Sequence, residues 1–154
     1  MTTPLVTLRP ITDPEFASWR DRAAASFASG IGPAQGLDPA GALEFAYRET
    51  DRLLPKGPST DNHLIWLACA GDQAVGSLWI NTRTRGAFIY GIEVDADHRG
   101  KGYGRAIMLA GEDECRRLGY SHLDLNVFGD NSTAIHLYES LGYIVTSQQM
   151  RKEL

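Results

Sequence analysis

Three glycines, Gly100, Gly102 and Gly104, stand within five residues of one another, between two different hydrophobic patterns. Residues 87–94 before them are rich in β-branched and aromatic side chains, whereas the apolar side chains in 105–118 recur at spacings of one, three and four. These patterns predict a strand followed by a helix. Glycine has no Cβ, so the backbone of the connection can approach a ligand closely. The free amides and the dipole of the helix start then favour a phosphate.

Two familiar phosphate-binding loops do not fit this segment. A P-loop has two glycines five residues apart followed by Lys and Ser or Thr, but Lys101 lies between glycines and no hydroxyl follows. A dinucleotide-binding turn needs a third glycine where this chain has Arg105 or Ile107, and it lies closer to its strand. The spacing therefore excludes both of these nucleotide sites.

The spacing Arg-x-x-Gly-x-Gly, formed by Arg99, Gly102 and Gly104, resembles the coenzyme A signature of the GNAT superfamily of N-acetyltransferases. The lead-in Ile-Glu-Val-Asp at 92–95 looks like the family's fourth strand and the turn after it. The resemblance extends over about residues 62–154.

Two further segments strengthen this resemblance. Residues 123–127 look like the fifth strand of the family. Residues 131–143 look like its fourth helix, with the Asn, Tyr and Leu-Gly-aromatic positions all present. Because the motifs occur in the right order and at the right separation, the resemblance is specific.

A chain of 154 residues is expected to form one domain, residues 1–154. Caps, periodicity and turn residues predict a mixed α/β protein with a mostly antiparallel sheet, helices on both faces and the order β-α-α-β-β-β-α-β-α-β. This is also the order that the GNAT resemblance implies. The expected strands are 6–8, 63–70, 73–81, 87–94, 121–127 and 144–152, and the expected helices are 13–29, 38–54, 102–118 and 131–141, with a loop over 30–36.

Composition narrows the classes of function. A net charge of −4 argues against general nucleic-acid binding. No apolar run is long enough for a membrane span, and no secretion signal is visible, so no membrane association is expected. The scattered His residues suggest no metal site, and Cys69 and Cys115 are expected to be buried, unpaired thiols, which suits the cytoplasm.

The resemblance implies that the fourth and fifth strands separate and that the pantetheine arm of acetyl-CoA fills the gap. Backbone amides of Ile92 or Val94 would then bind the arm and polarise the thioester carbonyl. Asn131 is expected to cap the next helix and to contact the coenzyme. The positions implied to bind acetyl-CoA are Ile92, Val94, Arg99, Gly100, Lys101, Gly102, Tyr103, Gly104, Arg105 and Asn131.

Tyr138 is the first catalytic candidate. The resemblance implies that its hydroxyl lies near the coenzyme sulfur and acts as a general acid. The alternative is a packing role, because Tyr138 lies in an apolar helical stripe with Ala134, Leu137 and Leu141.

Glu93 is the candidate general base, with Tyr90 or water beside residues such as Asn126 as alternatives. Strict strand alternation puts Phe88, Tyr90, Ile92 and Val94 on one face and Glu93 on the other. A bulge near Gly91 would change that alternation.

The predicted function is an acyltransferase that moves an acetyl group from acetyl-CoA to a primary amine of a small molecule or peptide. A non-catalytic acyl-CoA-binding or sensor domain is the alternative, and a longer acyl group stays open. Glu44, Glu49 and Asp51 are candidates for attracting the cationic amine. Since family members are often dimers, a homodimer is also an option.

Overall fold

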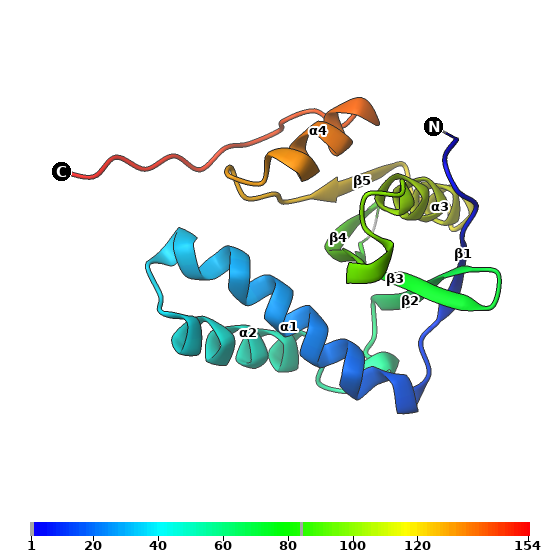
Figure 1. Cartoon of the computed structure of the whole chain (residues 1–154), viewed down its shortest axis with the longest axis horizontal. Coiled ribbons are helices and arrows are strands. Elements are labelled where there is room, and N and C mark those ends of the chain that lie inside the picture. The colour runs from blue at the N-terminus through cyan, green and yellow to red at the C-terminus, as the bar shows by residue number, and fades with distance from the viewer. Residues whose placement is uncertain (1, 84) are drawn as a thin grey trace.

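The computed structural model describes residues 2–83 and 85–154, which form one mixed sheet with helices on both faces (Figure 1). Short 3-10 helices, η1 (Gly57–Ser59) and η2 (Ala96–His98), lie in two connections. The longer elements are β1 (Thr7–Pro10), α1 (Asp13–Gln35), α2 (Pro39–Leu53), β2 (His63–Ala70), β3 (Gln73–Thr82), β4 (Gly86–Val94), α3 (Tyr103–Arg117), β5 (His122–Leu125) and α4 (Ser132–Ser140).

The sheet has the order β1-β2-β3-β4-β5. The first four strands pair antiparallel, and β5 pairs parallel to β4 because α3 carries the chain back across the sheet. The β2–β3 hairpin turns at Gly71, whose φ of 61° favours glycine. The predicted class, α/β with a mostly antiparallel sheet, is confirmed.

Alternating side chains of the strands build one core on each face of the sheet. Leu78, Ile107 and Met108 are fully buried between the sheet and α3. On the other face, Trp19 of α1 packs edge-on against Trp79 of β3, with ring centroids 5.4 Å apart. Fully burying an aliphatic or aromatic side chain contributes about 1.5–3 kcal/mol, so these two layers hold the sheet between the helices.

The first helix differs from its predicted bounds. It begins after Thr12, which forms a capping box with Glu15, and it continues to Gln35, although the segment 30–36 is expected to be a loop. Its glycines serve packing: a Cβ on Gly32 would lie 3.1 Å from that of Ala42. Tertiary packing therefore overrides the local turn signal, and the helix ends at Gly36 with a φ of 68°.

The C-terminal end also differs from the prediction. Residues 144–152 were expected to form a strand, but the described chain contains no strand after α4. Figure 1 shows this segment leaving the body of the protein. A strand requires a partner about 4.8 Å away, and β5, the last strand of the sheet, pairs only with β4.

Candidate active site

The sheet opens between β4 and β5. Their pairing stops at Ile89 and Leu125, although β4 continues to Val94. At the same point the β3–β4 register shifts, because Trp79 pairs with Gly91 while Ile80 pairs with Ile89. Tyr90 is therefore the extra residue of a bulge, which bends the strand and separates its second half from β5.

The open edge of β4 presents backbone groups. The Asp95 amide donates to the Val75 oxygen on the β3 side at 2.8 Å. Because successive amides in a strand point to opposite edges, the amides of Ile92 and Val94 point away from β3. The Arg99 side chain confirms this direction, since its Nε donates to the Val94 oxygen at 3.1 Å.

The glycine loop ends at the same opening. Gly100 and Gly102 have φ values of 74° and 87°, a conformation that non-glycine residues rarely adopt. The first backbone bond of α3 runs from Ala106 to the Gly102 oxygen, so the amides of 103–105 lack partners within the helix. A Cβ on Gly104 would lie 3.4 Å from Leu137 of α4, so this glycine lets α3 and α4 meet closely.

Three cations surround this helix start and bond neutral oxygens. Lys101 Nζ donates to the Asp97 carbonyl at 3.1 Å, and Arg105 donates to the Ser140 hydroxyl at 2.5 Å. Among the described residues, no carboxylate forms an ion pair with Arg99, Lys101 or Arg105, whereas Arg116 and Arg117 at the other end of α3 both have acidic partners. The charge at the helix start is therefore uncompensated, which favours an anionic ligand.

Tyr103, the remaining loop residue, has a half-buried side chain that packs on the core. Its ring lies 5.8 Å from that of His98. The side chain of Tyr103 thus packs inward, and its backbone amide is the group that the first turn of α3 leaves free for a ligand.

Asn131 and Tyr138 belong to α4. The Asn131 side chain accepts a bond from the Ala134 amide at 3.2 Å, so the predicted cap is confirmed. The Tyr138 ring is buried in the α3-side core, 6.0 Å from the ring of Tyr143. Burial raises the pKa of the Tyr138 phenol, which therefore carries its proton at neutral pH.

The bulge at Tyr90 corrects the direction expected for Glu93. Before the bulge Ile89 faces α3, and after it Ile92 and Val94 pack toward the same core. Glu93 therefore points to the α1 face, as does Tyr90, which stacks on Trp79 with centroids 5.1 Å apart. Strict alternation was wrong here, and the bulge considered as an alternative is present.

The environment of Glu93 suits a carboxylate that exchanges protons. Burial raises its pKa, and the Ser26 hydroxyl and the Arg22 guanidinium on α1 offset part of that rise. The alternative candidates are Tyr90, which is 38% exposed, and Asn126, which is also exposed. Neither of them carries a carboxylate.

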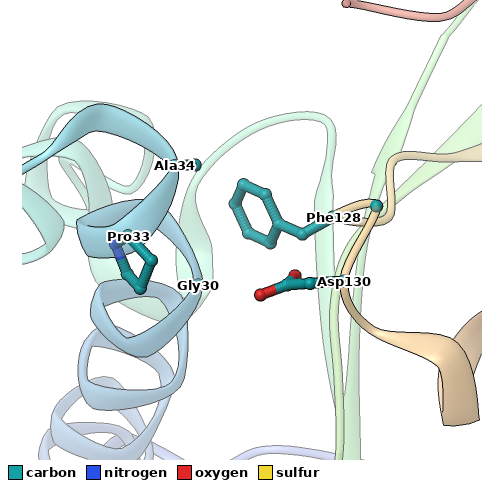
Figure 2. A pocket seen from close by; sticks show the side chains of 6 residues that line it. Gly30, Pro33, Ala34, Phe128 and Asp130 are labelled. Carbon is teal, nitrogen blue, oxygen red and sulfur yellow. The ribbon is translucent and has the colours of Figure 1, made fainter. Parts of the chain in front are cut away.

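A hollow of about 240 Å³ lies between the C-terminal part of α1 and the loop that joins β5 to α4. Phe128 and Asp130 point from this loop toward Pro33 of α1 (Figure 2). Gly30 lies one helical turn after Ser26, and a Cβ there would collide with the Phe128 ring. The hollow was not predicted, because only tertiary contacts bring Gly30 and Phe128 together.

The acidic residues proposed on α2 are mostly paired. Asp51 forms an ion pair with Arg20 at 2.6 Å, and Glu49 forms one with Arg52 at 2.8 Å. Glu44 is exposed. The structure thus compensates two of the three charges that were expected to attract an amine.

The described residues contain no group of three or more His, Cys, Asp or Glu side chains that would hold a metal ion. None of their helices has the length and apolar content that crossing a bilayer requires.

Several known proteins resemble this chain in sequence and in fold. The chain is 30% identical over 154 residues to the N-acetyltransferase YdgE of Bacillus subtilis, covering 96% of this chain and 98% of that protein. A mycothiol acetyltransferase of Propionibacterium freudenreichii is 40% identical over 89 residues, which are 53% of this chain and 28% of that protein.

The crystal structure of the acetyltransferase YycN of Bacillus subtilis superposes with a TM-score of 0.91 at 31% identity, over 97% of this chain and 98% of that one. The structure of AAC(6')-Iy, solved in complex with the bisubstrate analogue CoA-S-monomethyl-acetylneamine, has a TM-score of 0.61 at 14% identity over 97% of each chain and shares the fold. The profile of the acetyltransferase (GNAT) family matches residues 36–143. The chain therefore belongs to the GNAT family and is an acyltransferase.

Proposed function

We propose that this protein transfers the acetyl group of acetyl-CoA to a primary amine by direct attack in a ternary complex. The observation that carries the proposal is the open edge of β4 beside the uncompensated cations at the start of α3. A thioester arm and a pyrophosphate need these two features next to each other. AAC(6')-Iy, which has the same fold, binds a CoA analogue, and this supports the assignment.

In this proposal the pyrophosphate lies against the amides and cations of residues 99–105. The pantetheine arm adds to the edge of β4 through the amides of Ile92 and Val94, as an extra strand would. Asn131, at the start of α4, contacts the coenzyme from the opposite side of the opening.

The chemical step needs one base, one oxyanion donor and one acid. Glu93 takes a proton from the acceptor ammonium, and the free amine attacks the thioester carbonyl. An amide of Ile92 or Val94 stabilises the oxyanion. As the new C–N bond forms and the C–S bond breaks, Tyr138 gives its proton to the leaving thiolate. The nitrogen of the intermediate loses its second proton, which returns to the Tyr138 phenolate, and the amide and free CoA are the products.

We further propose that the amine enters at the hollow beside Phe128. Asp130 would attract its positive charge, and Phe128 and Pro33 would contact its apolar part. The hollow lies one turn of α1 from Ser26, the neighbour of Glu93, so an amine bound there would reach the base.

We also propose that the protein acts in the cytoplasm. Cys69 and Cys115 are buried and unpaired, as is usual for thiols in a reducing compartment.

Two glycines of α3 provide a matched test of the coenzyme site. Gly102 and Gly119 flank the helix and have φ values of 87° and 89°, so a side chain strains the backbone similarly at both. A Cβ on Gly102 would in addition lie 3.1 Å from Pro4 Cδ, whereas one on Gly119 would have no neighbour within 4 Å. Gly102→Glu puts a negative charge at the proposed pyrophosphate, and calorimetry should show a loss of acetyl-CoA affinity of roughly 100-fold. Gly119→Glu should bind normally.

Release of free CoA with a panel of amines then distinguishes the enzyme from a sensor. An enzyme acetylates at least one amine class, with a rate that saturates in both substrates. Acetyl-CoA binding without turnover on any amine would support the non-catalytic alternative, and unchanged affinity in Gly102→Glu would refute the coenzyme site itself.

A further inference from the structure

A second hollow, of about 340 Å³, lies between the N-terminal half of α1 and the sheet. We term it the Arg22 hollow. It is lined by Glu15, Ser18 and Arg22 of α1, Leu67 of β2, Ala74 of β3 and Asp95, which follows β4. A ligand in it would meet both apolar surface and charged groups, and the acetyl-transfer proposal gives this hollow no role.

Two of the three charged side chains in the Arg22 hollow have no ion-pair partner. Glu15 is compensated, because Arg9 binds both of its carboxylate oxygens at 2.9 Å. Arg22 donates to the neutral Ser18 hydroxyl at 2.5 Å. Within the part of the chain that the structure describes, no ion pair joins Arg22 or Asp95 to an opposite charge. The hollow therefore offers one positive and one negative group to a ligand.

The Arg22 hollow adjoins the proposed base. Asp95 follows Glu93 by two residues, so the two side chains share the α1 face and lie about 7 Å apart along the chain. On α1, Arg22 precedes Ser26, the neighbour of Glu93, by one helical turn. Burial raises the pKa of Glu93, and the Ser26 hydroxyl and the positive charge of Arg22 act against that rise. Arg22 and Asp95 thus flank the carboxylate that takes the proton in the proposed reaction.

We infer that the acceptor is an α-amino acid whose carboxylate binds Arg22. The inference rests on the proposed function and narrows its acceptor from primary amines in general to those with a carboxylate beside the nitrogen. The ammonium lies between Asp95 and Glu93, Glu93 takes its proton, and the amine attacks acetyl-CoA. The carboxylate accepts charge-assisted hydrogen bonds from Arg22. The products are the N-acetyl amino acid and free CoA.

The shape of an α-amino acid fits this arrangement. Its amine, carboxylate and side chain are bonded to one carbon and point in three directions. On α1, Arg22 lies one turn before Ser26 and Gly30 one turn after it, so the carboxylate extends to the Arg22 hollow and the side chain to the hollow beside Phe128. A carboxylate on Arg22 also offsets the charge that lowers the pKa of Glu93, so the acceptor itself makes Glu93 a stronger base.

Free amino acids and their carboxamides provide the test, since each pair differs only in the charge beside the amine. The carboxamides also stand for peptide N-termini, which lack that charge. With a panel of L-amino acids and the corresponding amides, kcat/KM of the parent should be at least about tenfold higher for an acid than for its amide, which corresponds to about 1.4 kcal/mol. Arg22→Gln should lose this preference and should still acetylate the amides.

The matched control is Arg48→Gln, at an exposed arginine of α2 that lines neither hollow. It changes the net charge equally and should keep the preference for the acids. If Arg22→Gln does not fold, Arg22→Lys, which keeps the positive charge, should retain part of the preference.

Equal kcat/KM for the acids and their amides in the parent would overturn the inference and leave acetyl transfer to amines intact. A preference for the acids that Arg22→Gln retains in full would also overturn it. If the protein acetylates no amine at all, with or without a carboxylate, the proposed function fails and the inference fails with it.

Discussion

The two halves of β4 have the same neighbour on one side and different surroundings on the other. From Gly86 to Ile89 the strand pairs with both β3 and β5, and Ile89 is buried. From Gly91 to Val94 it pairs with β3 alone, and its residues are half-buried. One bulged residue, Tyr90, separates a structural half from a half with free backbone groups.

This difference shows how one strand serves two purposes. The first half contributes burial and a complete hydrogen-bond ladder, which stabilise the sheet. The second half keeps amides available, and the bulge turns Glu93 to the α1 face while Ile92 and Val94 stay on the α3 face. A regular strand would satisfy its backbone and would leave nothing for a ligand to bind.

The largest expected effect is a difference in the free energy of unfolding between variants in the two halves of β4. Ile89→Ala should lower the free energy of unfolding by about 2–5 kcal/mol, because it leaves a cavity in a packed core. Ile92→Ala at a half-buried position should cost roughly half as much. Urea unfolding measures both. Equal losses would mean that the open half is packed as tightly as the closed one.

The next effect concerns Tyr138, the proposed general acid. Tyr138→Phe keeps the ring and removes the hydroxyl, and kcat should fall by roughly 10²-fold with little change in acetyl-CoA affinity. Tyr143→Phe is the matched control, since its ring lies 6.0 Å from that of Tyr138 and its hydroxyl bonds Glu112. If both variants keep full turnover, Tyr138 only packs in the core.

A smaller effect is expected for Glu93, in the open half itself. Glu93→Gln should lower kcat/KM by roughly tenfold at neutral pH and restore activity at high pH, where the amine is free without help. In the parent, activity should fall as pH decreases through the raised pKa of Glu93, and Gln should abolish this limb. If the pH profiles of the parent and of Glu93→Gln superimpose, Glu93 is not the base, and Tyr90 or bound water becomes the candidate.

The pH dependence of the free energy of unfolding gives an independent check on Glu93, because the raised pKa fixes the direction of the change. Burial raises its pKa above the ordinary 4.5, so the protonated form favours the folded state. This contribution is complete below about pH 4.5 and is lost as pH rises through the folded pKa. The stability of the parent relative to Glu93→Gln should therefore decrease over that interval in thermal unfolding at several pH values. A constant difference would mean that Glu93 is solvated.

The smallest effect tests the hollow between α1 and the loop that joins β5 to α4. Asp130→Asn should raise KM for a cationic amine by about 1.5–5-fold, since an exposed charge contributes only about 0.2–1 kcal/mol. The effect should shrink in high salt. Asp72→Asn in the β2–β3 turn should leave KM unchanged. An equal change in both variants would indicate a general effect of net charge.

Several parts of the fold followed from local signals. The Asp38 cap predicted the start of α2, and Asn131 predicted the start of α4. The turn at Gly71 and the α3 boundary at Gly102 were also expected, because a positive φ and a helix start depend on a few adjacent residues. Local chemistry is sufficient for such features.

Three features could not be obtained in this way. The length of α1 depends on Gly32 meeting Ala42, and the hollow depends on Gly30 meeting Phe128. The path of the chain after α4 depends on the bond from Tyr143 to Glu112 of α3 and on the bond from Arg151 to Ala34 of α1. In each case the deciding contact joins residues far apart in the chain, so no local pattern contains it.

The sequence by itself determined the family, the glycine loop and the acidic and phenolic groups available for chemistry, since these depend on residue types at fixed spacings. Only the tertiary structure decided where the strands separate and which face Glu93 occupies. The reason is that a bulge changes the side of every residue after it, and the register that creates this bulge is set by pairing with β3.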